Sequence, residues 1–402
     1  EGIYMQEQQK TSGIGQGLLW FGAGVSIAEI LTGALIAPLG ITKGIVAILF
    51  GHLAGGVIFY LAGYIGAQSN LSAIESTRIS FGKYGSFCFS ILNVLQLLGW
   101  TAVMIINGAR ALNAVVPSIQ SEVLWCVVIG VLICVWIIVG IKNLSKVNAV
   151  VVTALLVFSL VLGVIVFKGS SSGVSPAAGT LSFGAAVELS ITMPLSWMPL
   201  ISDYTRTVRH KKSGTLMATS GYFLGSCMMY TVGLGAAIYA GTGDIVTVLA
   251  KAGMGAVALF IVIFSTVTTT FLDAYSGGVS IVNLSGKISE KAAALAVCAA
   301  GTTLAIFVPI SQNENFLYLI GSVFAPLFAI LLTDYYLFGI TDVDKNIRLN
   351  VKNALIWVLG FAFFRFLLYL DPPIGVTLPT MIAVCALCIT VHFLFERRRA
   401  NV

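Results

Sequence analysis

The chain contains 402 residues, of which 58% are hydrophobic and only 9% are charged. An average soluble domain carries roughly 25% charged residues, and a water-soluble chain of this length would expose more surface than so few charges can cover. The composition therefore excludes an ordinary soluble protein and indicates that lipid is the solvent. The net charge of +6 does not require a nucleic-acid partner, because the membrane topology described below accounts for it.

A helix that spans the bilayer needs roughly 20 mainly apolar residues, and the sequence contains twelve such stretches. They are long, continuous and rich in Ala, Leu, Ile and Gly, which favours helices over the short alternating strands of a barrel. The predicted fold class is an all-α integral membrane protein with twelve transmembrane helices. The predicted spans are residues 15–38, 44–67, 86–113, 122–141, 148–168, 183–203, 216–240, 254–282, 291–309, 314–338, 350–370 and 374–395.

Two of these spans contain residues that interrupt helices. The first span carries Gly22, Gly24 and Pro38 around polar side chains, and the sixth carries Pro194 and Pro199. A proline inside a helix removes one hydrogen bond and costs about 3 kcal/mol unless a nearby group satisfies the freed carbonyl. Transporters with inverted repeats use interrupted helices to expose backbone groups at the bilayer midplane. The pattern predicts that helices 1 and 6 are broken at equivalent places in two halves, with ordinary proline kinks as the alternative.

The predicted organisation has three parts. Residues 1–14 form an N-terminal cytoplasmic tail, in which the residues before Met5 look like a cloning remnant. Residues 15–338 form a transport core of two halves, helices 1–5 and helices 6–10. Residues 339–402 add helices 11 and 12 and a cytoplasmic tail.

The distribution of positive charge predicts the orientation. With the N-terminus inside, the expected cytoplasmic segments hold all but five of the 22 Lys and Arg residues. Positively charged residues concentrate in cytoplasmic loops of membrane proteins. We therefore expect a multi-pass protein of the cell membrane, either inner or plasma membrane, with both termini in the cytoplasm. The five exceptions are Lys43, Arg110, Lys168, Lys251 and Arg365.

Two carboxylates lie near the middle of predicted spans: Glu29 in helix 1 and Asp273 in helix 8. Placing a carboxylate at the centre of a spanning helix costs roughly 2.5 to 3.5 kcal/mol on insertion scales, so each of the two is expected to have a specific role. A carboxylate in a dry pocket accepts hydrogen bonds from the exocyclic amine of an aminopyrimidine. The alternatives are a coupling proton, or hydroxyl and amide partners within the protein. Snorkelling from helix ends is expected instead for Glu188, Asp203, Asp334 and Arg365.

Helix 3 carries a polar stripe made of Gln96, Trp100 and Asn107. Their spacings of about four and seven residues place them on one helical face. An indole stacks on a planar heterocycle while amides bond its edges, so the stripe is interpreted as half of a base-binding pocket. Interhelical hydrogen bonding is the alternative.

Helix 8 carries many hydroxyl groups before Asp273. Hydroxyl and carbonyl oxygens are the ligands that hard cations accept, so the cluster is compatible with a sodium site. Threonine hydroxyls also bond to carbonyls of their own helix, which is the alternative. The residues are Ser265, Thr266, Thr268, Thr269 and Thr270.

Four strings together resemble the nucleobase cation symporter-1 family, which includes the cytosine permeases. They are AGYIGAQSN after helix 2, STRISFGKYGS in the next loop, ISDYTR at the end of helix 6, and FAPLFAILLTDYYLF in helix 10. Within that family, WMPLISDYTR and LQLLGWTAVM are most similar to the hydroxymethylpyrimidine transporters of thiamine-precursor salvage. The resemblance implies a leucine-transporter-type 5+5 inverted repeat, two additional C-terminal helices, and a substrate held between helices 1, 3, 6 and 8.

The resemblance also implies a sodium site between helices 1 and 8. Its ligands would be the carbonyl oxygens of Val25, Ala28 and Ser265 and the hydroxyls of Thr268 and Thr269. No other cofactor is expected.

The implied substrate site departs from the family in three places. Trp100 matches the stacking tryptophan, and Gln96 is one position from the usual glutamine, but the helix 6 aromatic position is Pro194 with its nearest ring at Trp197. The asparagine of helix 8 is replaced by Thr270, with an acidic residue one turn later. The predicted substrate-binding residues are Glu29, Gln96, Trp100, Asn107, Trp197, Thr270 and Asp273.

These features predict a monomeric symporter that imports a pyrimidine-like molecule, most specifically hydroxymethylpyrimidine, with Na⁺ by alternating access. A cytosine or purine permease, and coupling to H⁺, are the alternatives. A channel is disfavoured because the sequence has no ring of charges or repeated filter loop. An enzyme is disfavoured because no histidine lies near a carboxylate or cysteine in a recognised motif.

Overall fold

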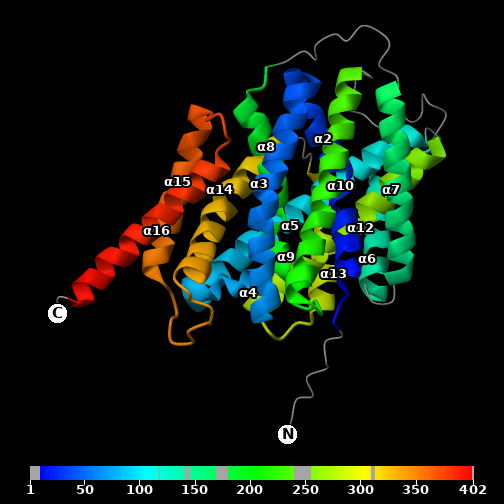
Figure 1. Cartoon of the computed structure of the whole chain (residues 1–402). Helices are drawn as coiled ribbons and strands as arrows, with labels where there is room; N and C mark the ends of the chain where they lie inside the picture. Colours follow the sequence, from blue (N-terminus) through cyan, green and yellow to red (C-terminus); the bar gives the residue numbers. More distant parts are fainter. Residues whose placement is uncertain are drawn as a thin grey trace.

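The computed structural model describes residues 10–116, 118–140, 145–168, 180–239, 255–308 and 313–400. Every regular element in these ranges is a helix (Figure 1). Residues 1–9 of the predicted N-terminal tail lie outside the described residues, as do Lys142 and Lys251 of the charge pattern.

Each of the twelve predicted spans coincides with one helix or a pair of helices, so the predicted all-α, multi-pass fold is confirmed. Eleven stretches of the described chain are long and apolar enough to cross a membrane, because α2 and α3 run together as Ile27–Ser69. The long helices are α3 Gly40–Ser69, α5 Arg78–Val115, α6 Glu122–Val139, α7 Ser145–Lys168, α10 Lys211–Tyr239, α12 Gly255–Leu284, α13 Glu290–Phe307, α14 Asn313–Leu332, α15 Val351–Leu370 and α16 Thr377–Ala400. Short helices cover Ala37–Leu39, Ala73–Ser76 (α4) and Thr333–Leu337.

The first predicted span is interrupted, as expected. It consists of α1 Gly13–Gly24 and α2 Ile27–Leu35, with Val25 and Ser26 between them in non-helical conformations. Ser26 caps α2, because its hydroxyl accepts a hydrogen bond from the Glu29 backbone N–H at 3.3 Å. The break therefore frees backbone groups near the middle of the span.

The sixth predicted span is also interrupted. It consists of α8 Phe183–Ser196 and α9 Met198–Thr205, joined at Trp197. Pro199 lies in the first turn of α9, where its missing N–H costs nothing, and Pro194 lies in the last turn of α8. The two prolines thus bracket the break that they were predicted to cause.

The helices form two groups. In the first group, α1 and α2 contact α10, while α3 contacts α8, α9 and α10. In the second group, α5, α6, α12 and α13 contact one another. Contacts between the groups are sparser, so the interface between the groups is the natural place for a cavity and for relative movement.

Helices α14, α15 and α16 pack together on one side of the bundle (Figure 1). Glu188 of α8 ties them to the first group. Its carboxylate accepts hydrogen bonds from the N–H groups of Val376 (2.6 Å) and Thr377 (2.8 Å) and from the Thr377 hydroxyl (2.7 Å). A carboxylate at the N-terminus of α16 satisfies amides that the helix leaves free.

The expectation that Glu188, Asp203 and Asp334 snorkel is wrong, because all three are buried and hydrogen-bonded. Asp203 accepts a hydrogen bond from the Ala73 N–H at 2.8 Å, and Asp334 accepts one from the Asn353 amide at 2.8 Å. Glu188 and Asp203 thereby join elements that are distant in sequence, whereas Asp334 joins the end of the tenth span to the next helix, α15. Arg365 is exposed on α15, as expected.

Candidate functional site

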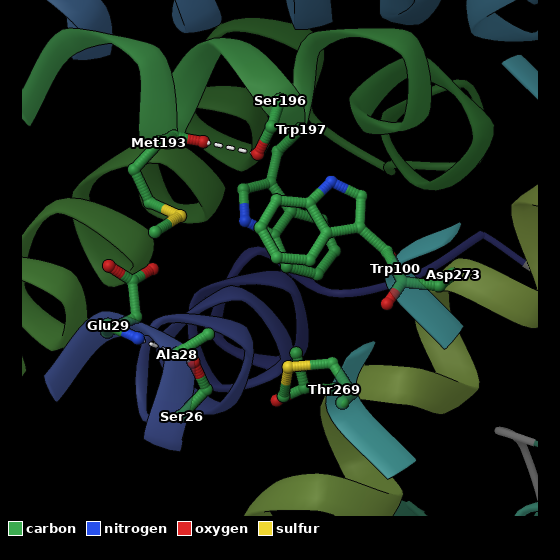
Figure 2. A pocket seen from close by; sticks show the side chains of 10 residues that line it. Ser26, Ala28, Glu29, Trp100, Met193, Ser196, Trp197, Thr269 and Asp273 are labelled. Atoms are coloured by element: carbon green, nitrogen blue, oxygen red, sulfur yellow. Dashed lines mark hydrogen bonds between the residues drawn. The ribbon is translucent and has the colours of Figure 1, made fainter. Parts of the chain in front are cut away.

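A narrow cavity, with about 20 Å³ of room for water-sized molecules, lies between the two helix groups. The first group supplies residues from the broken helices, and the second supplies residues from α5 and α12 (Figure 2). The lining residues are Ser26, Ala28, Glu29, Trp100, Met104, Met193, Ser196, Trp197, Thr269 and Asp273.

Asp273 is the acidic group of α12 that lines this cavity, and its side chain is only 3% exposed. Within the described ranges, no side chain or backbone group donates a hydrogen bond to its carboxylate. A buried charged or polar group without a partner is costly, and a carboxyl group in a dry site requires donors. The structure therefore leaves Asp273 open to a ligand.

Two tryptophans line the cavity from opposite helix groups. Trp100 of α5 meets Phe316 edge to face, with ring centroids 5.3 Å apart. Trp197 at the break of the sixth span meets Trp20 edge to face at 5.6 Å. Aromatic neighbours fix the orientation of both indoles, which suits them to bind a flat ring.

Glu29 also borders the cavity, but protein groups already occupy both of its oxygens. The Tyr222 hydroxyl donates to Oε1 at 2.8 Å, and the Ser226 hydroxyl donates to Oε2 at 2.7 Å. His52 Nε2 lies 2.6 Å from the Ser226 hydroxyl, while His52 Nδ1 donates to the Ile48 carbonyl at 2.9 Å. This arrangement agrees with the alternative that the Glu29 carboxylate finds its hydrogen-bond partners within the protein. The hydrogen-bonded network joins α2, α3 and α10.

Three predicted substrate residues do not line the cavity. The Gln96 amide donates to Asn93 Oδ1 at 2.9 Å and to the Ser196 carbonyl at 3.4 Å. The Asn107 amide nitrogen and the Thr270 hydroxyl are buried and have no hydrogen-bond partner in the described part of the chain. The polar stripe on helix 3 therefore serves helix packing at Gln96 and reaches the cavity only through Trp100.

Four lining residues were not predicted from the sequence: Ser26, Met104, Met193 and Ser196. Met104 lies four residues after Trp100, so helical periodicity could have found it. Met193 and Ser196 reach the cavity because α8 ends at Ser196. Helical periodicity does not predict which side chains face a cavity at such a break.

The predicted sodium ligands come from the break in helix 1 and from α12. Ala28 and Thr269 line the cavity together, and the Thr269 hydroxyl is buried with no partner in the described ranges. Thr268 instead donates to the Phe264 carbonyl of its own helix at 2.7 Å, which leaves its oxygen lone pairs free. A set of neutral oxygens suits a hard cation. No group of three or more His, Cys, Asp or Glu residues capable of holding a metal occurs among the described residues.

Discontinuous helices that border a cavity between two helix groups define a multi-pass membrane transporter. The chain belongs to the family described as permeases for cytosine/purines, uracil, thiamine and allantoin, whose model matches residues 5–354. The predicted membership of the nucleobase cation symporter family is thereby confirmed at the level of the family.

Curated relatives agree with this assignment. The chain is 27% identical to the cytosine permease of Escherichia coli K12 over 294 residues, which cover 72% of this chain and 69% of the relative. It is 25% identical to the purine-cytosine permease fcyB of Emericella nidulans over an alignment of 406 positions, which covers 90% of this chain and 78% of the relative.

Solved structures agree in fold. A closed structure of Mhp1, a nucleobase-cation-symport-1 family transporter with bromovinylhydantoin bound, superimposes with a TM-score of 0.81 at 16% identity and covers 97% of this chain and 94% of its own. A Na⁺-coupled sialic acid symporter superimposes with a TM-score of 0.72 at 13% identity and covers 97% of this chain and 92% of its own.

Proposed function

We propose that the protein is a symporter that imports an aminopyrimidine, specifically hydroxymethylpyrimidine, together with Na⁺. The observation that carries the proposal is the buried carboxylate of Asp273, which has no hydrogen-bond partner in the described chain and lines a cavity with Trp100 and Trp197. The two indoles stack on a flat ring, and the carboxylate accepts hydrogen bonds from its exocyclic amine.

Cytosine is the second candidate, because the curated relatives are named as permeases for cytosine or for purines and cytosine. Cytosine carries a ring carbonyl that requires a donor. No Asn or Gln is among the described residues that line the cavity, and the Gln96 amide bonds to Asn93 and Ser196. The donors left for such a carbonyl are the Trp100 indole N–H and the Thr269 hydroxyl, which have no partner in the described chain. The lack of an amide that could bind the carbonyl and the neighbouring ring N–H together favours hydroxymethylpyrimidine, which has an amine but no ring carbonyl.

Sodium would bind beside the substrate, at the carbonyls of Val25, Ala28 and Ser265 and the hydroxyls of Thr268 and Thr269. The unpartnered Thr269 hydroxyl at the cavity supports this placement. The ion and the substrate would each contact both helix groups, and would together stabilise a closed state between outward and inward forms. H⁺ coupling is the alternative.

The test is uptake of radiolabelled hydroxymethylpyrimidine into proteoliposomes with and without an inward Na⁺ gradient. We expect uptake driven by the gradient and resistant to excess cytosine. Thr269→Val should raise the Na⁺ concentration needed for half-maximal uptake by about tenfold, equivalent to about 1.4 kcal/mol. Thr266→Val is the matched control, because that hydroxyl is equally buried and unpartnered but lies away from the cavity.

Uptake that is blocked best by cytosine or adenine would reject hydroxymethylpyrimidine as the substrate. Uptake that follows a proton gradient and ignores Na⁺ would reject sodium coupling.

A further inference from the structure

Two carboxyl groups border the cavity, and no positively charged side chain among the described residues lines it. Asp273 and Glu29 are its acidic residues, and no Lys, Arg or His occurs among the described residues that line it. Glu29 accepts hydrogen bonds from Tyr222 and Ser226, whereas Asp273 accepts none from the described chain. An ionised group inside a membrane protein requires a counter-charge, which at Asp273 has to come from what the cavity binds.

The remaining walls of the cavity also favour positive charge. The faces of Trp100 and Trp197 carry the negative end of the aromatic quadrupole, which attracts cations strongly when water is excluded. Met104 and Met193 add polarizable sulfur atoms and present no competing donor. Two indoles and an open carboxylate form a recognition site for a flat organic cation.

We propose that the transported aminopyrimidine is bound as its cation, with the additional proton on a ring nitrogen. The carboxylate of Asp273 is the counter-ion, and it accepts a hydrogen bond from the amino group or the ring N–H. The proton comes from water when the substrate binds and returns to water when the substrate is released, so no other reactant is required. This inference rests on the proposed function and identifies the chemical class of substrate that the site selects.

The opposite assignment places the proton on Asp273 and leaves the heterocycle neutral. In that case a neutral ligand of the same shape would bind as well as a cation. The two assignments are separated by ligands that share ring size and amine but differ in charge.

The experiment is competition against radiolabelled hydroxymethylpyrimidine uptake at fixed pH and fixed Na⁺. The competitors are 4-aminopyridine, whose ring nitrogen is protonated at neutral pH, and aniline, which has the same amine on a neutral ring. We expect 4-aminopyridine to inhibit at a concentration at least about tenfold lower than aniline. The reason is that two indole faces attract a cation strongly in a site without water. In Asp273→Asn this preference should fall to within about twofold, because the counter-charge is gone.

Equal inhibition by the two competitors in the wild-type protein would overturn the inference while leaving the proposed function standing. If hydroxymethylpyrimidine is not taken up at all, the proposed function fails, and thermal stabilisation of the purified protein by 4-aminopyridine over aniline still tests the cation site. Should Asp273→Asn not fold, Trp197→Leu provides a second variant. Loss of one indole face should reduce the cation preference severalfold, and an unchanged preference would contradict the role assigned to the tryptophans.

Discussion

At the scale of single residues, two carboxylates that look alike in the sequence have different surroundings. Glu29 and Asp273 both lie mid-span and are both almost fully buried. Hydroxyls from α10 donate to both oxygens of Glu29, whereas Asp273 faces the cavity and has no hydrogen-bond partner among the described residues. The first carboxylate therefore joins helices, and the second is available for binding.

The hydrogen bonds around Glu29 predict a stability effect at Ser226. Its hydroxyl contacts both Glu29 and His52, so Ser226→Ala leaves two buried polar groups short of a partner and should cost about 1 to 3 kcal/mol. A lower midpoint of thermal unfolding in detergent would show this loss. Ser159→Ala is the matched control, because the Ser159 hydroxyl is buried and has no partner in the described chain. A Ser226→Ala variant as stable as this control would contradict the bridging role.

At the scale of helices, glycines set how closely α3 approaches the broken sixth span. A Cβ atom on Gly51 would lie 2.4 Å from the Cβ of Ser190, and one on Gly66 would lie 2.3 Å from the Cβ of Ser202. These glycines therefore allow α3 to pack closely against the sixth span. Because α3 packs against both α8 and α9, this close packing also sets the position of the break at Trp197.

This packing predicts opposite effects for two glycines of the same helix. Gly51→Ala forces a Cβ atom against α8 and should reduce both folded yield and uptake, with a stability loss of about 1 to 3 kcal/mol typical of overpacking. Gly56→Ala has its nearest neighbour at 3.9 Å and should be tolerated or stabilising by up to about 1 kcal/mol, because alanine favours helix. Thermal unfolding of the two variants side by side is the measurement, and equal effects would refute the packing account.

At the scale of the whole molecule, α1 begins and α16 ends at the same end of the bundle (Figure 1). The same end carries an ion pair between Arg206 and Glu290 at 3.0 Å, and the Tyr275 hydroxyl donates to Glu290 at 2.8 Å. Thr11 pairs with the chain after α9, because its N–H donates to the Thr207 carbonyl at 2.8 Å. The Arg206–Glu290 ion pair joins the two helix groups at this end, so release of substrate there requires that this pair separate.

The charge pattern predicts that this end faces the cytoplasm. Green fluorescent protein fused after Val402 should fluoresce, because it matures inside the cell, whereas alkaline phosphatase fused at that site should be inactive. Alkaline phosphatase fused after Lys168, at the opposite end of α7, should be active. The reverse pair of results would overturn the predicted orientation.

The sequence by itself determined the helices, the two breaks and the family. These features depend on local properties: apolar length, proline and glycine placement, and strings that are contiguous along the chain. Residue type also identified Trp100, Trp197 and Asp273 as candidate site residues. An indole or a carboxylate inside a membrane span is unusual whichever way its side chain faces.

Only the tertiary structure decided what each polar residue contacts. Glu188 contacts the start of α16, which lies 189 residues further along the chain. Glu29 contacts hydroxyls of α10, and the Gln96 amide donates to Asn93 and to the Ser196 carbonyl at the break. A buried polar group takes whichever partner the packing of distant helices brings within hydrogen-bond distance, and local sequence does not encode that partner. Asp273 is open to a ligand because no group in the described part of the chain donates a hydrogen bond to its carboxylate.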